Sequence, residues 1–254
     1  MTPQQFLARM KKGAVAPAYL FAGTEALNRE RCRAALMEAA LAPEERAEGV
    51  TKYDLDETSL REVVDDARTL SLFAPRRVIV AGNAEQALPR AKSDEDDGPA
   101  GDDGGLAAYL ADPTPGVVLL VEAVRFDFEG EDKKKLDRVR KFYGAVTEVV
   151  ELKRYNAGEA REEAQRLARA AGVEIDPGAL ELLVEALGAD AARIAVEIEK
   201  LALYAPQGRA ISEDDIAALV PDARAANIFS LVNALGRRDR ARSLQLLDTL
   251  MRDG

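Results

Sequence analysis

The sequence predicts a doubly wound α/β domain followed by an all-helical region, and three observations support this. Short apolar or β-branched runs alternate with helical patterns in the first part of the chain, at residues 18–22, 51–55, 77–81, 117–121 and 146–150. Two of them, 77–81 and 117–121, lack polar alternation, which is typical of strands buried on both faces of a parallel sheet. After residue 153 the strand signals end and helical patterns follow one another. Strands alternating with helices indicate a parallel, doubly wound sheet.

The segments between the predicted strands have the spacing of amphipathic helices. A polar start at Thr24 and Glu25 precedes a helix over 26–41, so a strand, a tight turn at Gly23 and a helix open a βαβ unit. A second helix is predicted over 59–70, with one apolar face. A basic helix is predicted over 132–141. Its charge is that of a solvated helix face, with contact to DNA phosphates as the alternative.

Four helices are predicted in the region that follows. They cover residues 158–171, 177–187 and 191–204, and a short helix begins at Ser212, which can form a capping box with Asp215. Asp176 is predicted to cap the second of them, before Pro177. Two more amphipathic helices, 227–236 and 240–251, need further helices to pack against. We therefore expect domains at 1–152, 153–222 and 223–254.

The composition excludes several classes of chemistry. The chain has no histidine and one cysteine, Cys32, so it holds no Ser-His-Asp triad, Cys-His dyad, His-ligated zinc site or disulfide. Its net charge of −10 argues against binding DNA alone, because phosphate contacts need clustered Lys and Arg. The sequence has no apolar run long enough to span a membrane, so we expect a cytoplasmic protein with no membrane partner.

The turn after the first predicted strand is where a phosphate-binding loop would lie. Such a loop needs glycines, a lysine and a Ser or Thr in the pattern GxxxxGK[ST]. Here Gly23 is followed by Thr24 and Glu25, with no lysine, and Glu25 places negative charge where a triphosphate would sit. We therefore expect a degenerate nucleotide loop with no cofactor, no metal site and no catalytic residues. The alternative is a divergent P-loop-like NTPase that binds nucleotide at the Gly23-Thr24 turn.

Two adjacent large apolar residues, Leu72 and Phe73, lie between the 59–70 helix and the 77–81 strand. Pattern alone favours a role in the core. The alternative is an anchor that projects into a partner, because two adjacent apolar side chains on a short connector seldom both point inward, and Pro75 stiffens the connector. Such a pair supplies about 4 kcal/mol when buried.

The segment 93–105 is acidic and rich in glycine, and it is predicted to be a flexible surface loop. A loop that binds Ca²⁺ or Mg²⁺ is the alternative, although the spacing does not match the EF-hand pattern.

Four blocks in order resemble one known family. They are residues 18–25, residues 70–73 with 76–80, residues 197–204, and residues 227–229. Together they resemble the delta subunit of bacterial DNA polymerase III. The resemblance implies an AAA+-like α/β base, a helical lid, and a helical collar that begins at residue 223 and joins the other clamp-loader subunits.

The resemblance also implies a function. The family's subunit lacks ATP-binding residues, and it binds and opens the sliding clamp (the beta subunit) through a Leu-Phe pair that matches Leu72 and Phe73. This reverses the assignment of that pair from core to contact. The protein would then have no intrinsic catalysis, although its holoenzyme is grouped with DNA-directed DNA polymerases. It would meet DNA only within the assembled complex.

Overall fold

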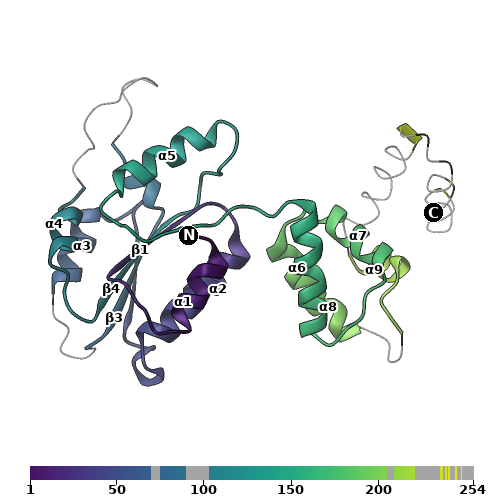
Figure 1. Ribbon diagram of the computed structural model, residues 1–254, viewed down its shortest axis with the longest axis horizontal. Coiled ribbons are helices and arrows are strands. Elements are labelled where there is room, and N and C mark those ends of the chain that lie inside the picture. The colour runs from purple at the N-terminus through teal and green to yellow at the C-terminus, as the bar shows by residue number, and fades with distance from the viewer. Residues whose placement is uncertain are drawn as a thin grey trace. The chain divides into compact units, whose positions relative to one another are not determined.

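The computed structural model describes residues 1–69, 75–89, 103–204, 209–220 and six single positions between 235 and 247. The chain forms two compact units, Met1–Arg154 and Tyr155–Gly254, which are described separately (Figure 1). The predicted boundary between residues 222 and 223 lies outside the described residues. The three-domain organisation therefore stays a prediction.

The first unit is built on a five-stranded sheet with the order β2-β3-β4-β1-β5. Every described pairing is parallel, which confirms the predicted α/β class. The strands are β1 (Ala18–Ala22), β2 (Val50–Asp54), β3 (Arg77–Gly82), β4 (Val117–Ala123) and β5 (Val149–Glu151).

The last strand begins three residues later than predicted. Val146 belongs instead to the connection before it, where its N–H donates to the Tyr143 carbonyl at 2.9 Å and its side chain is buried in the core. Val146 is apolar and buried like a strand residue, so the sequence pattern predicted a strand that begins before the observed one.

One face of the sheet is covered by α1 (Pro3–Met10) and α2 (Ala26–Ala40). Tyr19 and Phe21 of β1 point to this face, and Phe6 packs edge-on against both rings, with centroid distances of 5.2 and 5.3 Å. Cys32 of α2 is buried in the same layer.

The other face is covered by α3 (Leu60–Arg68), α4 (Leu106–Ala111) and α5 (Asp132–Phe142), as Figure 1 shows. Leu20 and Ala22 of β1 point to this side, which is the alternation expected of a strand buried on both faces. Two short 3₁₀ turns, Pro43–Glu45 and Ala84–Ala87, complete the unit. The predicted apolar face of α3 is confirmed: Leu60, Val63, Val64 and Ala67 are buried.

The second unit contains α6 (Ala157–Ala170), α7 (Pro177–Ala186), α8 (Ala191–Tyr204) and α9 (Glu213–Leu219) around one apolar core. The capping box of Ser212 and Asp215 is confirmed. Asp176 does occupy the N-cap position of α7, but its side chain makes no capping hydrogen bond, so that part of the prediction is wrong. Its backbone N–H instead donates to the Ile211 carbonyl at 2.9 Å, beside a parallel bridge between Ile175 and Ile211.

Within the described ranges of both units, no helix is long and apolar enough to cross a lipid bilayer.

Asp215 gives a test of the second unit. Its carboxylate accepts from Arg209 at 2.9 Å and from the Ser212 N–H at 2.9 Å, and its side chain is buried. The Arg209 guanidinium is the main cause of a pKa held well below the usual range. We expect Asp215→Asn to lower the free energy of unfolding by about 1–3 kcal/mol at pH 7.

Because the folded-state pKa is depressed, this stability is present above the unfolded pKa of about 3.9 and is lost as the pH falls below it. Thermal unfolding followed by circular dichroism at pH 7 and near pH 3 measures the difference. Asp214→Asn is the matched control, since Asp214 is the exposed neighbour in the same first turn. Equal losses for the two variants would contradict the assigned role of Asp215.

Candidate functional site

The turn between β1 and α2, at Gly23, Thr24 and Glu25, is the candidate site that the structure describes. The carboxyl end of β1 lies between those of β4 and β5. In doubly wound sheets, ligands bind in a crevice outside the carboxyl ends of the strands. The groups around this turn therefore decide whether the crevice is open.

Gly23 is held in a contact that only glycine tolerates. Its φ is +119°, and its N–H donates to the Ala123 carbonyl at 3.0 Å. A Cβ at this position would lie 2.3 Å from the Leu152 carbonyl oxygen and 2.8 Å from the Phe128 ring. The Leu152 backbone also donates to the Ala22 carbonyl and accepts from the Glu25 N–H. The chain leaving β5 therefore lies directly against the turn.

Glu25 occupies the amino end of α2 with its own carboxylate. The side chain is buried, Oε1 accepts from the Leu27 N–H at 3.0 Å, and Oε2 accepts from the Asn28 N–H at 2.7 Å. Free N–H groups at a helix amino end are what a bound phosphate would use. Here a carboxylate binds two of them and adds a negative charge that repels phosphate.

The Thr24 hydroxyl joins a polar network made by residues distant in sequence. It donates to Asp127 at 3.3 Å and accepts from the Arg154 Nε at 3.0 Å, and Arg154 also pairs with Asp127 at 3.0 Å. The Arg154 side chain is largely exposed, so the ion pair contributes little stability. The network does, however, engage the Thr24 hydroxyl as both donor and acceptor within the chain.

These three observations describe a turn occupied by the chain itself. Gly23, Thr24 and Glu25 are consecutive in this turn, and Asp127, Leu152 and Arg154 are the residues placed around them. Cys32, farther along α2, adds no nucleophile, because burial raises the pKa of its thiol to about 12. Asp127, Leu152 and Arg154 were not singled out from the sequence, since no local motif marks them.

Comparison with known proteins gives the family. The model of the family described as "DNA polymerase III, delta subunit" matches residues 19–146, which is half of the chain. The chain belongs to the DNA polymerase III delta subunit family. This confirms the resemblance inferred from the sequence blocks.

One curated relative covers nearly the whole of this delta-family chain. It is the DNA polymerase III subunit delta of Bacillus subtilis (strain 168), with 26% identity over 243 residues, 96% of this chain and 68% of the relative.

Two solved structures have a similar fold. The Bacillus subtilis DNA clamp loader delta protein (YqeN) superposes with a TM-score of 0.59 and 24% identity, covering 100% of this chain and 72% of its own. The Thermotoga maritima RuvB Holliday junction branch migration motor gives a TM-score of 0.51 at 15% identity, covering 96% and 80%. At these identities the likeness shows the fold alone.

The second candidate site of this delta-family chain, Leu72 and Phe73, lies outside the described residues, in the segment 70–74. Its two flanks are described. Arg77, at the start of β3, donates from Nη2 to the Thr69 carbonyl at 2.7 Å and from Nη1 to the Asp66 carboxylate at 3.1 Å. One buried guanidinium therefore ties the end of α3 to the start of β3, across the segment that contains the pair.

A backbone contact fixes the second flank further. The Arg77 N–H donates to the Gly116 carbonyl at 2.8 Å, and a Cβ on Gly116 would lie 2.5 Å from the Pro75 carbonyl oxygen. The sequence predicted Arg77 only as the first residue of a strand. A charged residue at the first position of a fully buried strand is the signal that could have identified it.

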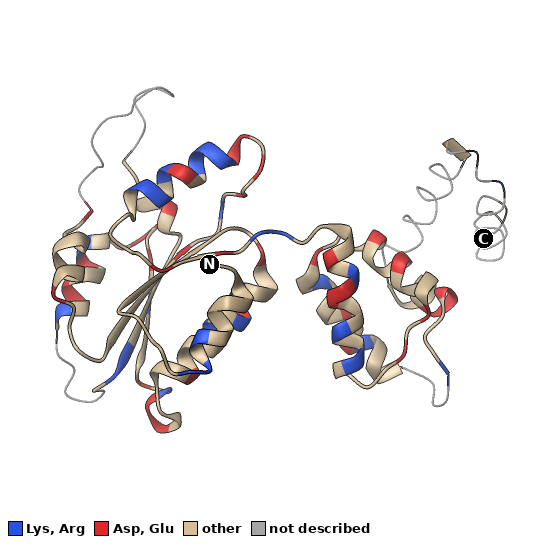
Figure 2. Cartoon of the chain, viewed as in Figure 1, with Lys and Arg blue, Asp and Glu red and all other residues tan. Residues whose placement is uncertain are grey.

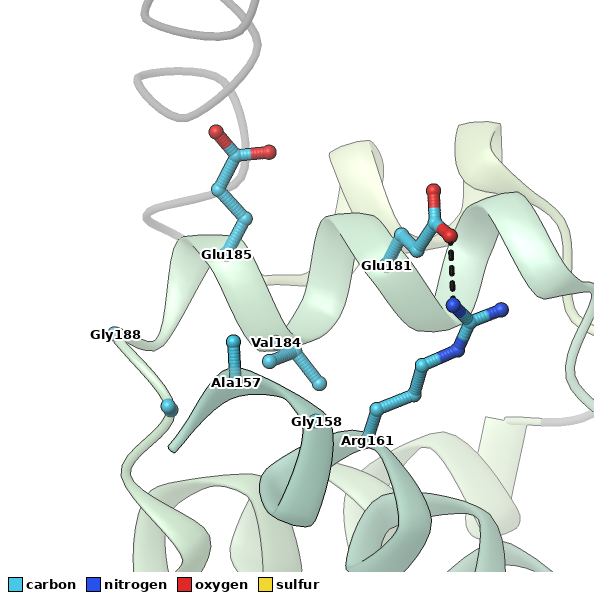
Figure 3. Close-up of a pocket in the computed structure, with 8 residues that line it drawn as sticks. Ala157, Gly158, Arg161, Glu181, Val184, Glu185 and Gly188 are labelled. Carbon is cyan, nitrogen blue, oxygen red and sulfur yellow. Dashed lines mark hydrogen bonds and ion pairs between the residues drawn. The ribbon is translucent and has the colours of Figure 1, made fainter. Parts of the chain in front are cut away.

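The helical unit contains a hollow of about 510 Å³ between α6 and α7, shown in Figure 3. Small residues and Val184 line it, and Arg161 of α6 pairs with Glu181 of α7 at 2.8 Å beside it. Among the described residues that line the hollow, no set of side chains converges on a common point as a catalytic site requires. The residues drawn are Ala157, Gly158, Arg161, Glu181, Val184, Glu185, Gly188 and Ala189.

The close packing at Gly23 predicts a large effect of a single methyl group. We expect Gly23→Ala to destabilise the first unit by several kcal/mol, because the Cβ overlaps the Leu152 carbonyl and the positive φ is strained. Gly13→Ala is the control: its φ is +69° with nothing within 4 Å of the added Cβ, so it carries only about 1 kcal/mol of strain. Urea unfolding of both variants tests this, and equal losses would contradict the contact.

Proposed function

We propose that this chain is a clamp-loader subunit that binds and opens the sliding clamp and does not itself hydrolyse nucleotide. Membership of the DNA polymerase III delta subunit family carries this proposal. The similar Bacillus subtilis structure agrees with it, because that structure is of a DNA clamp loader delta protein.

The anchor in this proposal is the Leu72 and Phe73 pair. Their connector runs between the Thr69 and Arg77 positions that the buried guanidinium joins, and Pro75 restricts it further. A short connector with tied ends loses less conformational entropy on binding than a free loop. Two apolar side chains of this size supply about 4 kcal/mol on burial in a partner's pocket, close to a thousandfold in affinity.

The turn at Gly23 supports the non-catalytic part of the proposal. The Leu152 carbonyl packs against Gly23, and the Glu25 carboxylate takes the helix N–H groups that would bind phosphate. The alternative, a divergent NTPase using this turn, would have to displace both. ATP-driven steps then belong to other subunits, which residues 223–254 would join as part of a collar. The resulting assembly would act in DNA replication.

The clamp contact is tested by a double substitution. We expect Leu72→Ala/Phe73→Ala to weaken binding to the sliding clamp of the same organism by about a hundredfold or more, since both anchoring side chains are removed. Surface plasmon resonance with immobilised clamp measures the change. The matched control is Leu203→Ala/Tyr204→Ala, another adjacent leucine and aromatic pair, which is exposed at 91% and 54% on α8. Unchanged affinity for the first variant would overturn the assigned site.

The turn at Gly23 is tested by ATP turnover. We expect the purified chain to show no ATP hydrolysis above background, because its own carboxylate occupies the amino end of α2. A phosphate-release assay with the chain and with Thr24→Ala and Glu25→Gln variants measures this. Turnover by the unmodified chain that either substitution abolishes would establish the NTPase alternative.

A further inference from the structure

The hollow between α6 and α7 is a feature of the helical unit that the clamp proposal does not use (Figure 3). It lies where the first turn of α6, at Ala157 and Gly158, meets the last turn of α7, at Val184. Its volume of about 510 Å³ falls within the roughly 300–1,000 Å³ of binding pockets in proteins. Because the side chains of its lining are small, the chain itself leaves this space unfilled.

Hydrogen bonds fix both walls of the hollow within the chain. Asn156 and Glu159 form a capping box at the start of α6, with bonds of 2.9 and 3.0 Å. After the end of α7, the Ala189 N–H donates to the Val184 carbonyl at 3.0 Å, a closing bond typical of helix ends. Both walls are therefore formed before a ligand arrives, which lowers the conformational entropy lost on binding.

Ala189 is strained, and its place in the lining gives that strain a use. Its φ is +59°, in the left-handed region that alanine adopts only at a cost in stability. Glycine would adopt this conformation without the cost. Strained residues of this kind gather at ligand sites. The Ala189 methyl group adds apolar surface to the wall of the hollow, which a glycine would not supply.

The charge around the hollow favours a cation. Arg161 is neutralised by Glu181 at 2.8 Å, whereas Glu185 is exposed and has no ion pair with any residue of the described part of the chain. Figure 3 shows Glu185 apart from that pair. Helix α7 contains no Lys or Arg, so Figure 2 shows it with red and no blue. Glu185 also lies at the carboxyl end of the helix, where the helix dipole adds negative charge.

The arrangement of polar and apolar groups favours a protein partner over a small molecule. A small-molecule site needs several polar groups aimed at one point. Among the described residues that line the hollow, Ala157, Val184 and Ala189 form an apolar floor, and the charged groups lie around it. An apolar centre within a polar rim is the arrangement of pockets that accept an anchoring side chain from another protein.

We propose that the hollow between α6 and α7 binds a protein partner through one large apolar side chain, with a Lys or Arg of the partner beside Glu185. The apolar side chain fills the space over Val184, and the cation complements the unpaired carboxylate and the carboxyl end of α7. The inference stands independently of the clamp proposal, because the Leu72 and Phe73 pair belongs to the first unit.

The test uses NMR of the full chain with labelled valine and alanine methyl groups. The probe is an alanine-based helical peptide with one Phe and a Lys four residues later, a spacing that puts both on one helix face. We expect saturable shifts at Val184 and Ala189. Alanine in place of the Phe, or Glu in place of the Lys, should weaken binding at least about fivefold. No shift at about 5 mM peptide, or equal binding of all three peptides, would overturn the proposal.

Variants of the chain locate the contact. Ala157→Leu fills the hollow from an exposed position, and it should weaken binding at least about tenfold without lowering the melting temperature. Glu185→Gln should weaken it about threefold to fivefold. The matched control is Glu199→Gln, which removes the same charge from an exposed position on α8 outside the hollow and should leave binding unchanged.

Three further results would contradict the proposal. Unchanged binding by Ala157→Leu would place the peptide elsewhere. Equal weakening by Glu185→Gln and Glu199→Gln would show a general effect of net charge. Free 2-phenylethylammonium, which carries a ring and a cation on one small molecule, should bind more weakly than the peptide, and equal affinity would indicate a small-molecule site instead. Clamp binding is measured separately, so none of these results bears on it.

Discussion

The contact between the Leu152 carbonyl and Gly23 is the constraint on which the first unit depends. Through it the chain leaving β5 is joined to the turn after β1, and the adjacent hydrogen bonds connect both to β4 and to α2. The same contact lies at the carboxyl end of β1, which is the edge where doubly wound sheets bind ligands. Because backbone meets backbone here, a side chain larger than that of glycine has no space.

The groups around this turn differ from those of a phosphate loop. A phosphate loop needs helix N–H groups that are free and backbone that can approach the ligand closely. In this chain the Glu25 carboxylate accepts hydrogen bonds from two of those N–H groups, and the Leu152 carbonyl after β5 lies directly against Gly23. The sheet then serves as a rigid frame that presents surfaces. The clamp anchor proposed on this frame acts through the burial of apolar side chains.

Much of the fold could be predicted because the strands are buried on both faces. The continuous apolar runs of β3 and β4 are recognisable in the sequence without any further information. Ser59, Ser212 and Asp215 form capping boxes that indicate where two helices begin. Helix α1 was missed although Thr2, a proline and Gln5 form a capping box that could have indicated it. Helix α4 was missed because it has six residues, too few for a periodic pattern.

The candidate sites also combine features that the sequence shows with contacts that only the folded chain shows. The sequence by itself determined what the turn at Gly23 lacks and where the charge on α5 is concentrated, because both are properties of consecutive residues. Only the tertiary structure decided that Asp127, Leu152 and Arg154 close that turn, and that Arg77 ties Thr69 to β3. Most of these partners lie about a hundred or more residues from the turn. No local periodicity encodes such contacts, since they form only when the sheet brings strand ends together.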